Sequence, residues 1–121
     1  VQLETLIMSA PLVVEAAVIG YPDKQWLERP LAVTVLAEGA SPTIETAERL
    51  RASMRKELPS WMLPEYWTFV KSIDKTSVGK FDKKDLRTHL AEGEYNIIRL
   101  KGPGESQRLA ATEATDLSRE N

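Results

Sequence analysis

The chain of 121 residues contains no cysteine, which excludes a disulfide scaffold and fits a reducing compartment. With one histidine, His89, and no cysteine, a zinc site of the usual kind has no ligands, and we expect no metal site. No apolar run approaches the roughly 20 residues of a membrane span, and no signal peptide opens the chain. We therefore expect a cytoplasmic protein without a transmembrane segment, peripheral contact with a membrane being the alternative.

An excess of positive charge is also missing. The chain has 16 Lys and Arg against 18 Asp and Glu, a formal charge of −2, which argues against nucleic acid as the main partner. Its apolar content of 42% and charged content of 28% are ordinary for a globular fold, and its length allows one domain with at most a tail. Because the chain opens inside an apparent helix and without Met, we expect a fragment.

The first third of the chain predicts a helix followed by two strands. Apolar residues share one helical face within residues 3–7, and Pro11 ends that segment. Residues 13–19 are almost continuously apolar and rich in β-branched side chains, which indicates a strand covered on both faces. We expect a long polar loop over residues 20–30 and a second strand, antiparallel to the first, over residues 31–36.

A second helix is predicted from Ser41 or Thr43 as N-cap to Pro59. Its apolar residues form one stripe at spacings of three and four: Ile44, Ala47, Leu50, Met54 and Leu58. Residues 66–70 are aromatic and β-branched and predict a third strand.

A third helix is expected from Asp82 to about Leu90, and the pattern decays after Gly93. These elements predict an α+β fold, in which helices pack on a small three-stranded, largely antiparallel sheet. We assign residues 1–92 to this domain and residues 93–121 to a partly disordered tail, with a short helix around Leu109 as an alternative.

The turn before the third helix is the most informative stretch. Asp82 is a good N-cap, and Phe81 can pack on Leu86 to fix the angle of entry into the helix. Gly79 frees the backbone at the tip, so Lys80 projects from an anchored loop toward a phosphate or carboxylate. Most lysines of this kind are simply solvated. A P-loop is excluded, because the Gly-Lys pair is followed by Phe.

This turn resembles the last motif of the acyl-adenylate-forming enzymes in the run Lys75-Thr76-Ser77-Val78-Gly79-Lys80. Residues 13–20 and the segment Glu28-Arg29-Pro30 resemble the same superfamily, which includes acyl-CoA synthetases, peptide-synthetase adenylation domains and luciferases. The resemblance implies that Lys80, with Gly79 beside it, meets ATP and the substrate carboxylate in the adenylation step. Asp74 stands where the family usually has Pro, and Leu27 stands where Gly is usual.

The resemblance also implies a coenzyme A site. The position of Trp26 lies near coenzyme A in related enzymes, where an indole could stack on adenine; core packing is the alternative. Arg55 matches a basic residue that faces the 3′-phosphate, although a cation there also complements the helix dipole. The segment Leu63-Pro64-Glu65 would lie beside the same nucleotide.

Over residues 1–90 the chain is most similar to fatty-acid–CoA ligases, notably in residues 61–64 and 79–84. The implied reaction joins a carboxylic acid to ATP, giving acyl-AMP, and coenzyme A then displaces AMP. The family alternates by rotating this mobile C-terminal domain against a larger N-terminal one. That partner would hold the carboxylic acid, the ATP and its Mg²⁺, so the isolated chain should be inactive.

Two alternatives stay open. One, within the enzyme class, is an adenylation domain of a peptide synthetase or an aryl-acid ligase. The other is a non-catalytic α+β interaction module, such as an RNA-recognition sheet. The latter would need exposed aromatic residues on its central strands and a basic surface, which this sequence lacks.

Overall fold

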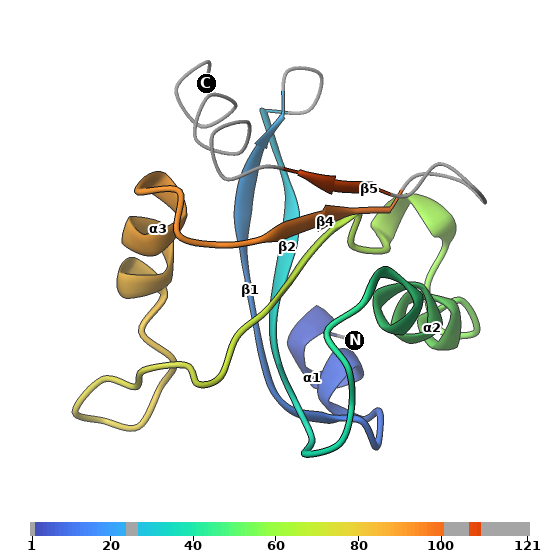
Figure 1. Ribbon diagram of the computed structural model, residues 1–121, viewed down its shortest axis with the longest axis horizontal. Coiled ribbons are helices and arrows are strands. Elements are labelled where there is room, and N and C mark those ends of the chain that lie inside the picture. Colours follow the sequence, from blue (N-terminus) through green and yellow to red (C-terminus); the bar gives the residue numbers. More distant parts are fainter. Residues whose placement is uncertain (1, 24–26, 101–106, 110–121) are drawn as a thin grey trace.

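A mixed sheet runs through the protein, and the strands follow one another in space as they do in the sequence (Figure 1). The computed structural model describes residues 2–23, 27–100 and 107–109. The strands are β1 (Val13–Asp23), β2 (Leu27–Leu36), β3 (Tyr66–Phe69), β4 (Ile97–Arg99) and β5 (Gln107–Leu109). Neighbouring strands are antiparallel except β2 and β3, which are parallel.

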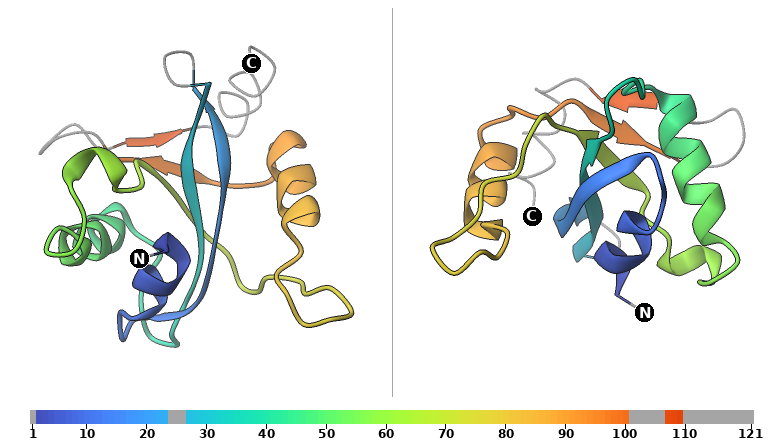
Figure 2. Two further views of the ribbon diagram at one scale, coloured as in Figure 1. Left: turned by 180° about the vertical axis from the view of Figure 1, so that it is seen from behind. Right: turned by 90° about the horizontal axis from the view of Figure 1, so that it is seen from below.

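Helices cover both faces of the sheet (Figures 1 and 2). One core cluster joins α3 (Lys83–Ala91) to the face of β2 that carries Leu31 and Val33. The other joins α1 (Leu3–Met8) and α2 (Ile44–Met54) to the face that carries Ala32. Because both faces are covered, β1 has buried side chains on each side of the sheet, with Ala17 and Ile19 in one cluster and Val13 and Ala16 in the other, as the composition of residues 13–19 predicted.

The predicted α+β fold with a largely antiparallel sheet is confirmed, but the prediction of three strands is wrong. Beyond Gly93 the chain forms β4, whose Ile97 and Ile98 are fully buried on opposite faces of the sheet. A strand of three residues is too short to show an alternation of apolar and polar side chains, which is why the sequence did not predict β4. Leu109 lies in β5 instead of a helix. The rest of residues 101–121 lies outside the described residues.

The predicted long loop is wrong for residues 20–23 and 27–30, because these residues continue β1 and β2 as a ladder that ends with Asp23 opposite Leu27. The polar residues there lie beyond the core, so hydrophobicity did not reveal the strands. Tyr21 is fully buried, and its ring stacks on Tyr66 with centroids 4.1 Å apart. The predicted coenzyme A residue Trp26 lies outside the described residues.

The predicted helix starts are confirmed at two places. Thr43 accepts a hydrogen bond from the Thr46 amide at 3.2 Å, and Asp82 accepts one from the Asp85 amide at 3.1 Å. Helix α2 ends at Met54, four residues before the predicted end, and a short 3₁₀ helix, η1 (Ser60–Met62), leads on toward β3.

Candidate active-site loop and nucleotide-binding surface

The turn that carries Lys80 is a small hairpin closed by backbone hydrogen bonds. At its base the Asp82 amide donates to the Asp74 carbonyl at 2.9 Å, and nearer the tip the Thr76 amide donates to the Lys80 carbonyl at 2.7 Å. The tip is closed by the Gly79 amide, which donates to the Thr76 carbonyl at 2.9 Å, and Gly79 has a φ of 85°. The glycine therefore supplies the left-handed conformation that the tip requires.

The Lys80 side chain is exposed at the end of this hairpin, which projects away from the sheet in the views of Figures 1 and 2. Its two lysine neighbours are engaged: Lys75 pairs with Glu15 at 2.8 Å, and Lys83 pairs with Glu4 at 3.2 Å. Within the described part of the chain, Lys80 forms no ion pair or side-chain hydrogen bond. Its ammonium is thus presented to solvent and open to an anionic group.

A shallow cavity of about 620 Å³ lies beside the hairpin. It is lined by residues of α1, β1, the hairpin and the start of α3: Glu4, Met8, Val14, Glu15, Lys75, Gly79, Lys80, Phe81 and Lys83. Because Glu4 and Glu15 neutralise two of the lysines, Lys80 is the cation here that can attract a phosphate or carboxylate from outside.

A second group of basic side chains gathers around helix α2. Arg55 caps the C-terminal end of α2 and is exposed. Burial and the nearby charges of Arg55 and Arg29 lower the pKa of Arg51, while Glu65 acts in the opposite direction. Two residues of the predicted coenzyme A site, Arg55 and Glu65, thus lie near the Arg51 guanidinium. The structure adds Arg29 and Arg51, which the sequence analysis did not assign to a site.

An exposed aromatic ring lies next to this group. Trp61 is 72% exposed, and its carbonyl accepts a hydrogen bond from Arg29 Nη2 at 3.1 Å. The sequence analysis used Trp61 only as part of a motif. An exposed indole whose backbone is bonded to an arginine is a suitable platform for a nucleotide base.

The predicted segment 63–65 is held in place by the body of the domain. The side chain of Leu63 is 1% exposed, and the Pro64 carbonyl accepts a hydrogen bond from Trp67 Nε1 at 3.0 Å. Glu65 pairs with Arg99 Nε at 2.6 Å. The segment therefore offers a ligand a fixed backbone shape and the partly buried carboxylate of Glu65.

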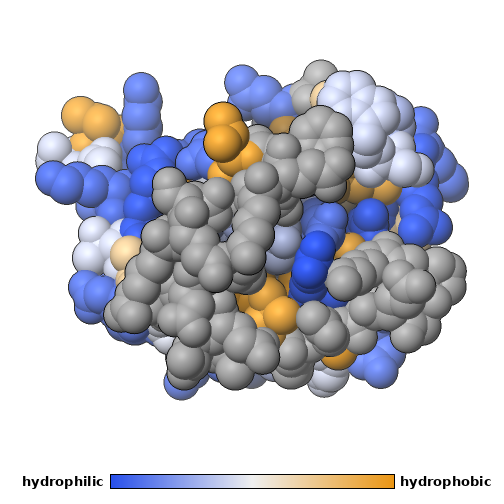
Figure 3. All heavy atoms as spheres, turned by 90° about the horizontal axis from the view of Figure 1, so that it is seen from above, coloured by the Kyte–Doolittle hydropathy of each residue, from blue (hydrophilic) through white to orange (hydrophobic). Residues whose placement is uncertain are grey.

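The two regions lie at opposite ends of the molecule, the hairpin on one side of the sheet and α2 with η1 on the other (Figures 1 and 2). Seen from above, the described surface is mostly hydrophilic, and apolar side chains form small separate spots (Figure 3). The protein thus has two distinct polar faces, each with cations available to an anionic ligand.

Residues 2–80 match the family model described as the AMP-binding enzyme C-terminal domain. This chain belongs to that family. The C-terminal domain is 44% identical over 89 residues to a long-chain-fatty-acid–CoA ligase of Thermus thermophilus, covering 72% of this chain and 16% of that protein. It is 39% identical over 87 residues to the 3-methylmercaptopropionyl-CoA ligase of Ruegeria pomeroyi, with 72% and 16% covered.

Solved structures show the same fold. The C-terminal domain superposes on an acyl-CoA synthetase of Brucella canis with a TM-score of 0.65 and 38% identity, covering 70% of this chain and 16% of that one. The chain spans 16% of the length of the curated relatives named above. Among the described residues, no helix could cross a membrane, and no cluster of His, Cys, Asp or Glu is arranged to hold a metal ion.

One departure from the family pattern has a structural consequence. Leu27, where Gly is usual, has a φ of 67°, a left-handed conformation that glycine adopts without strain. The leucine side chain is 78% exposed, so it gains little from packing in return. This position therefore has a backbone conformation that suits glycine better than the leucine found there.

Proposed function

We propose that this C-terminal domain serves as the lid of an AMP-forming acid–thiol ligase of the fatty-acid–CoA ligase type. The full-length enzyme would use ATP to convert a carboxylic acid to acyl-AMP, and coenzyme A would then release AMP and give acyl-CoA. The names of the relatives support a CoA ligase. Their acids differ, so a fatty-acid substrate rests on similarity to the Thermus ligase and on residues 61–64 and 79–84.

Lys80 is the residue that we propose for the adenylation step, with Gly79 shaping the loop around the nucleotide. Negative charge is shared between the attacking carboxylate and the α-phosphate, and an ammonium aimed there lowers the barrier by about 3 kcal/mol, or a hundredfold in rate. The single observation that supports this role is that Lys80, exposed and without an ion pair among the described residues, lies on a hairpin held by backbone hydrogen bonds.

Coenzyme A would bind to the opposite face. Arg55, supported by Arg29 and Arg51, would meet the phosphates, and Trp61 would stack on the adenine. Burial and, after it, the like charges of Arg55 and Arg29 lower the pKa of Arg51, and a bound anion would offset the repulsion between these charges. Trp26 and residues 63–65 stay in the proposed site as neighbours of the nucleotide.

The partner in this proposal is a larger N-terminal domain of the same protein, which would hold the acid, the ATP and its Mg²⁺. No metal-binding cluster occurs among the described residues of this domain, so the Mg²⁺ would be held elsewhere, together with the nucleotide. The isolated chain should therefore have no ligase activity. An RNA-recognition module is disfavoured, because helices cover both faces of the sheet.

The test is Lys80→Ala in the full-length enzyme, assayed for each half-reaction. We expect acyl-adenylate formation to fall about a hundredfold, while thioester formation from supplied acyl-adenylate is retained. Lys84→Ala, which removes an exposed lysine on α3, is the matched control and should leave both steps unchanged. Equal loss of both half-reactions in Lys80→Ala would contradict the proposed role.

A further inference from the structure

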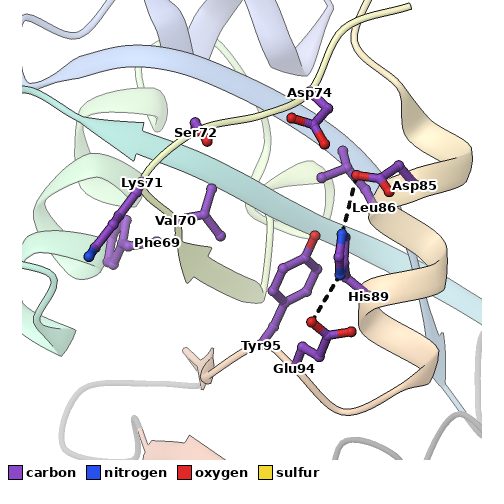
Figure 4. Close-up of a pocket in the computed structure, with 10 residues that line it drawn as sticks. All are labelled: Phe69, Val70, Lys71, Ser72, Asp74, Asp85, Leu86, His89, Glu94 and Tyr95. Atoms are coloured by element: carbon purple, nitrogen blue, oxygen red, sulfur yellow. Dashed lines mark ion pairs between the residues drawn. The ribbon is translucent and has the colours of Figure 1, made fainter.

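A second pocket, of about 390 Å³, lies between the segment that follows β3, helix α3 and the residues after α3 (Figure 4). It shares no lining residue with the cavity beside Lys80. Pockets of roughly 300 Å³ and above can hold small ligands, so this one suits a small group.

Three carboxylates from different segments line this pocket: Asp74 before the hairpin, Asp85 on α3 and Glu94 after it. His89 lies between the last two, with Nε2 3.3 Å from Asp85 Oδ2 and Nδ1 3.1 Å from Glu94 Oε1. Lys71 also lines the pocket, but Figure 4 shows its side chain pointing away from the carboxylates. The three carboxylates together with His89 therefore carry a net negative charge at neutral pH, even when His89 is protonated.

Tyr95 is the observation that points to a ligand. The residue is only 9% exposed, and its ring stands beside His89 with the hydroxyl directed toward the side of the pocket where Asp74 and Leu86 lie (Figure 4). Within the described ranges, no residue forms a hydrogen bond with this hydroxyl. The oxygen opens into the cavity that it lines, where a hydrogen-bond donor could reach it.

The Tyr95 hydroxyl and the charges around it favour a cation as the ligand of this pocket. Burial, followed by the charges of Asp85, Glu94 and Asp74, raises the pKa of Tyr95 to about 12, so the phenol stays neutral and its oxygen can accept a hydrogen bond. An anion would be repelled by the same carboxylates. The apolar lining from Phe69, Val70 and Leu86 favours a cation that carries an aliphatic stem.

We propose that this pocket binds an aliphatic primary ammonium group, which donates hydrogen bonds to Tyr95 Oη and the nearby carboxylates while its stem packs on Leu86 and Phe69. The source is either a lysine side chain of a partner protein or a free alkylamine. This site is independent of the proposed ligase function, because neither Lys80 nor the arginine group takes part in it.

The experiment is an NMR titration of the isotope-labelled 121-residue chain with n-butylammonium. We expect saturable amide shifts at His89, Glu94 and Tyr95, with a Kd on the order of 1 mM. The uncharged 1-butanol and the anionic butyrate, at matched ionic strength, should give none. A blocked peptide with one lysine, compared with its glutamine counterpart, distinguishes the sources: tighter binding than butylammonium indicates a protein partner, and weaker binding indicates a free amine.

Two variants test the contacts. Tyr95→Phe keeps the ring and should weaken n-butylammonium binding about tenfold, and Asp74→Asn should weaken it about threefold. Glu45→Gln, an exposed charge change on α2, is the control and should have no effect. The proposal is overturned if butylammonium gives no saturable shift, if 1-butanol gives the same shifts, or if a folded Asp74→Asn chain binds as tightly as the parent.

Discussion

Leu27 is the one non-glycine residue with a positive φ in the described part of the chain. The left-handed conformation costs a residue with a Cβ about 1–2 kcal/mol of folding free energy. Glycine avoids this cost, but it loses more conformational entropy on folding, which destabilises the folded state by roughly 0.5–1 kcal/mol. Leu27→Gly should therefore stabilise the protein by about 0.5–1 kcal/mol, measured by urea denaturation. Leu27→Ala keeps the Cβ and is the control, with no gain expected. A lower stability of the glycine variant would show that the leucine side chain has a packing role.

His89 is the single histidine of the chain, so its titration can be followed without ambiguity. The hydrogen bond that His89 donates to Glu94, together with the charge of Asp85, raises the pKa of His89 above 6.5 and outweighs the opposing effect of desolvation. Hydrogen bonding to His89 in turn lowers the pKa of Glu94. By NMR we expect a pKa above 6.5 in the parent, falling in Glu94→Gln and, less strongly, in Asp85→Asn.

The sign of the effect on stability follows from the same shift. A histidine whose pKa is raised by folding contributes stability that is full below its unfolded pKa of about 6.5 and is lost as the pH rises through the folded pKa. His89→Gln should therefore destabilise the protein at mildly acidic pH and leave it unchanged near pH 9. Equal destabilisation at both pH values would mean that packing, and not charge, explains the contribution of His89.

At the scale of the element, the Lys80 hairpin depends on its backbone more than on its side chains. A Cβ at Gly79 would meet no atom within 4 Å, so Gly79→Ala should cost only the strain of a φ of 85°, about 1–2 kcal/mol. The cost should be local, since the tip contributes no core residue. We expect faster hydrogen exchange at the Thr76 and Gly79 amides, with protection of the core strands unchanged.

Gly79→Asn is the matched variant, because asparagine tolerates the left-handed conformation better than alanine does. It should retain more of the protection at both amides. In the full-length enzyme, the alanine variant should also slow adenylation, since Lys80 would lose its fixed direction. Exchange rates identical to the parent in Gly79→Ala would show that the tip does not need the glycine.

At the scale of the whole molecule, the two polar faces at opposite ends suit a domain that presents each face in turn. In the full-length enzyme, Arg55→Ala should raise the apparent KM for coenzyme A about tenfold, because one charged hydrogen bond to a phosphate is lost. Adenylation should not change. Arg49→Ala, on the exposed surface of the same helix, is the control. An unchanged KM in Arg55→Ala removes this residue from the coenzyme A site.

The sequence by itself determined the features that depend on neighbours along the chain. Thr43 and Asp82 cap their helices through bonds to residues three positions away, and Gly79 shapes a turn of four residues. These are local interactions, which a pattern of residue types reveals. The exposed Lys80 on its hairpin was predicted for the same reason, and membership of the family was predicted from the resemblance of short motifs such as residues 75–80.

Only the tertiary structure decided which distant residues meet. Residues 20–23, 27–30 and 97–99 form strands because a neighbouring strand pairs with their backbone, and backbone pairing leaves little trace in the side chains of short or peripheral strands. Likewise, Tyr95 and Asp74 line the same pocket because the order of elements brings the segments after β3 and after α3 together. Contacts across the fold depend on that order and not on spacing in the sequence, so the ammonium pocket and the arginine group appear only in three dimensions.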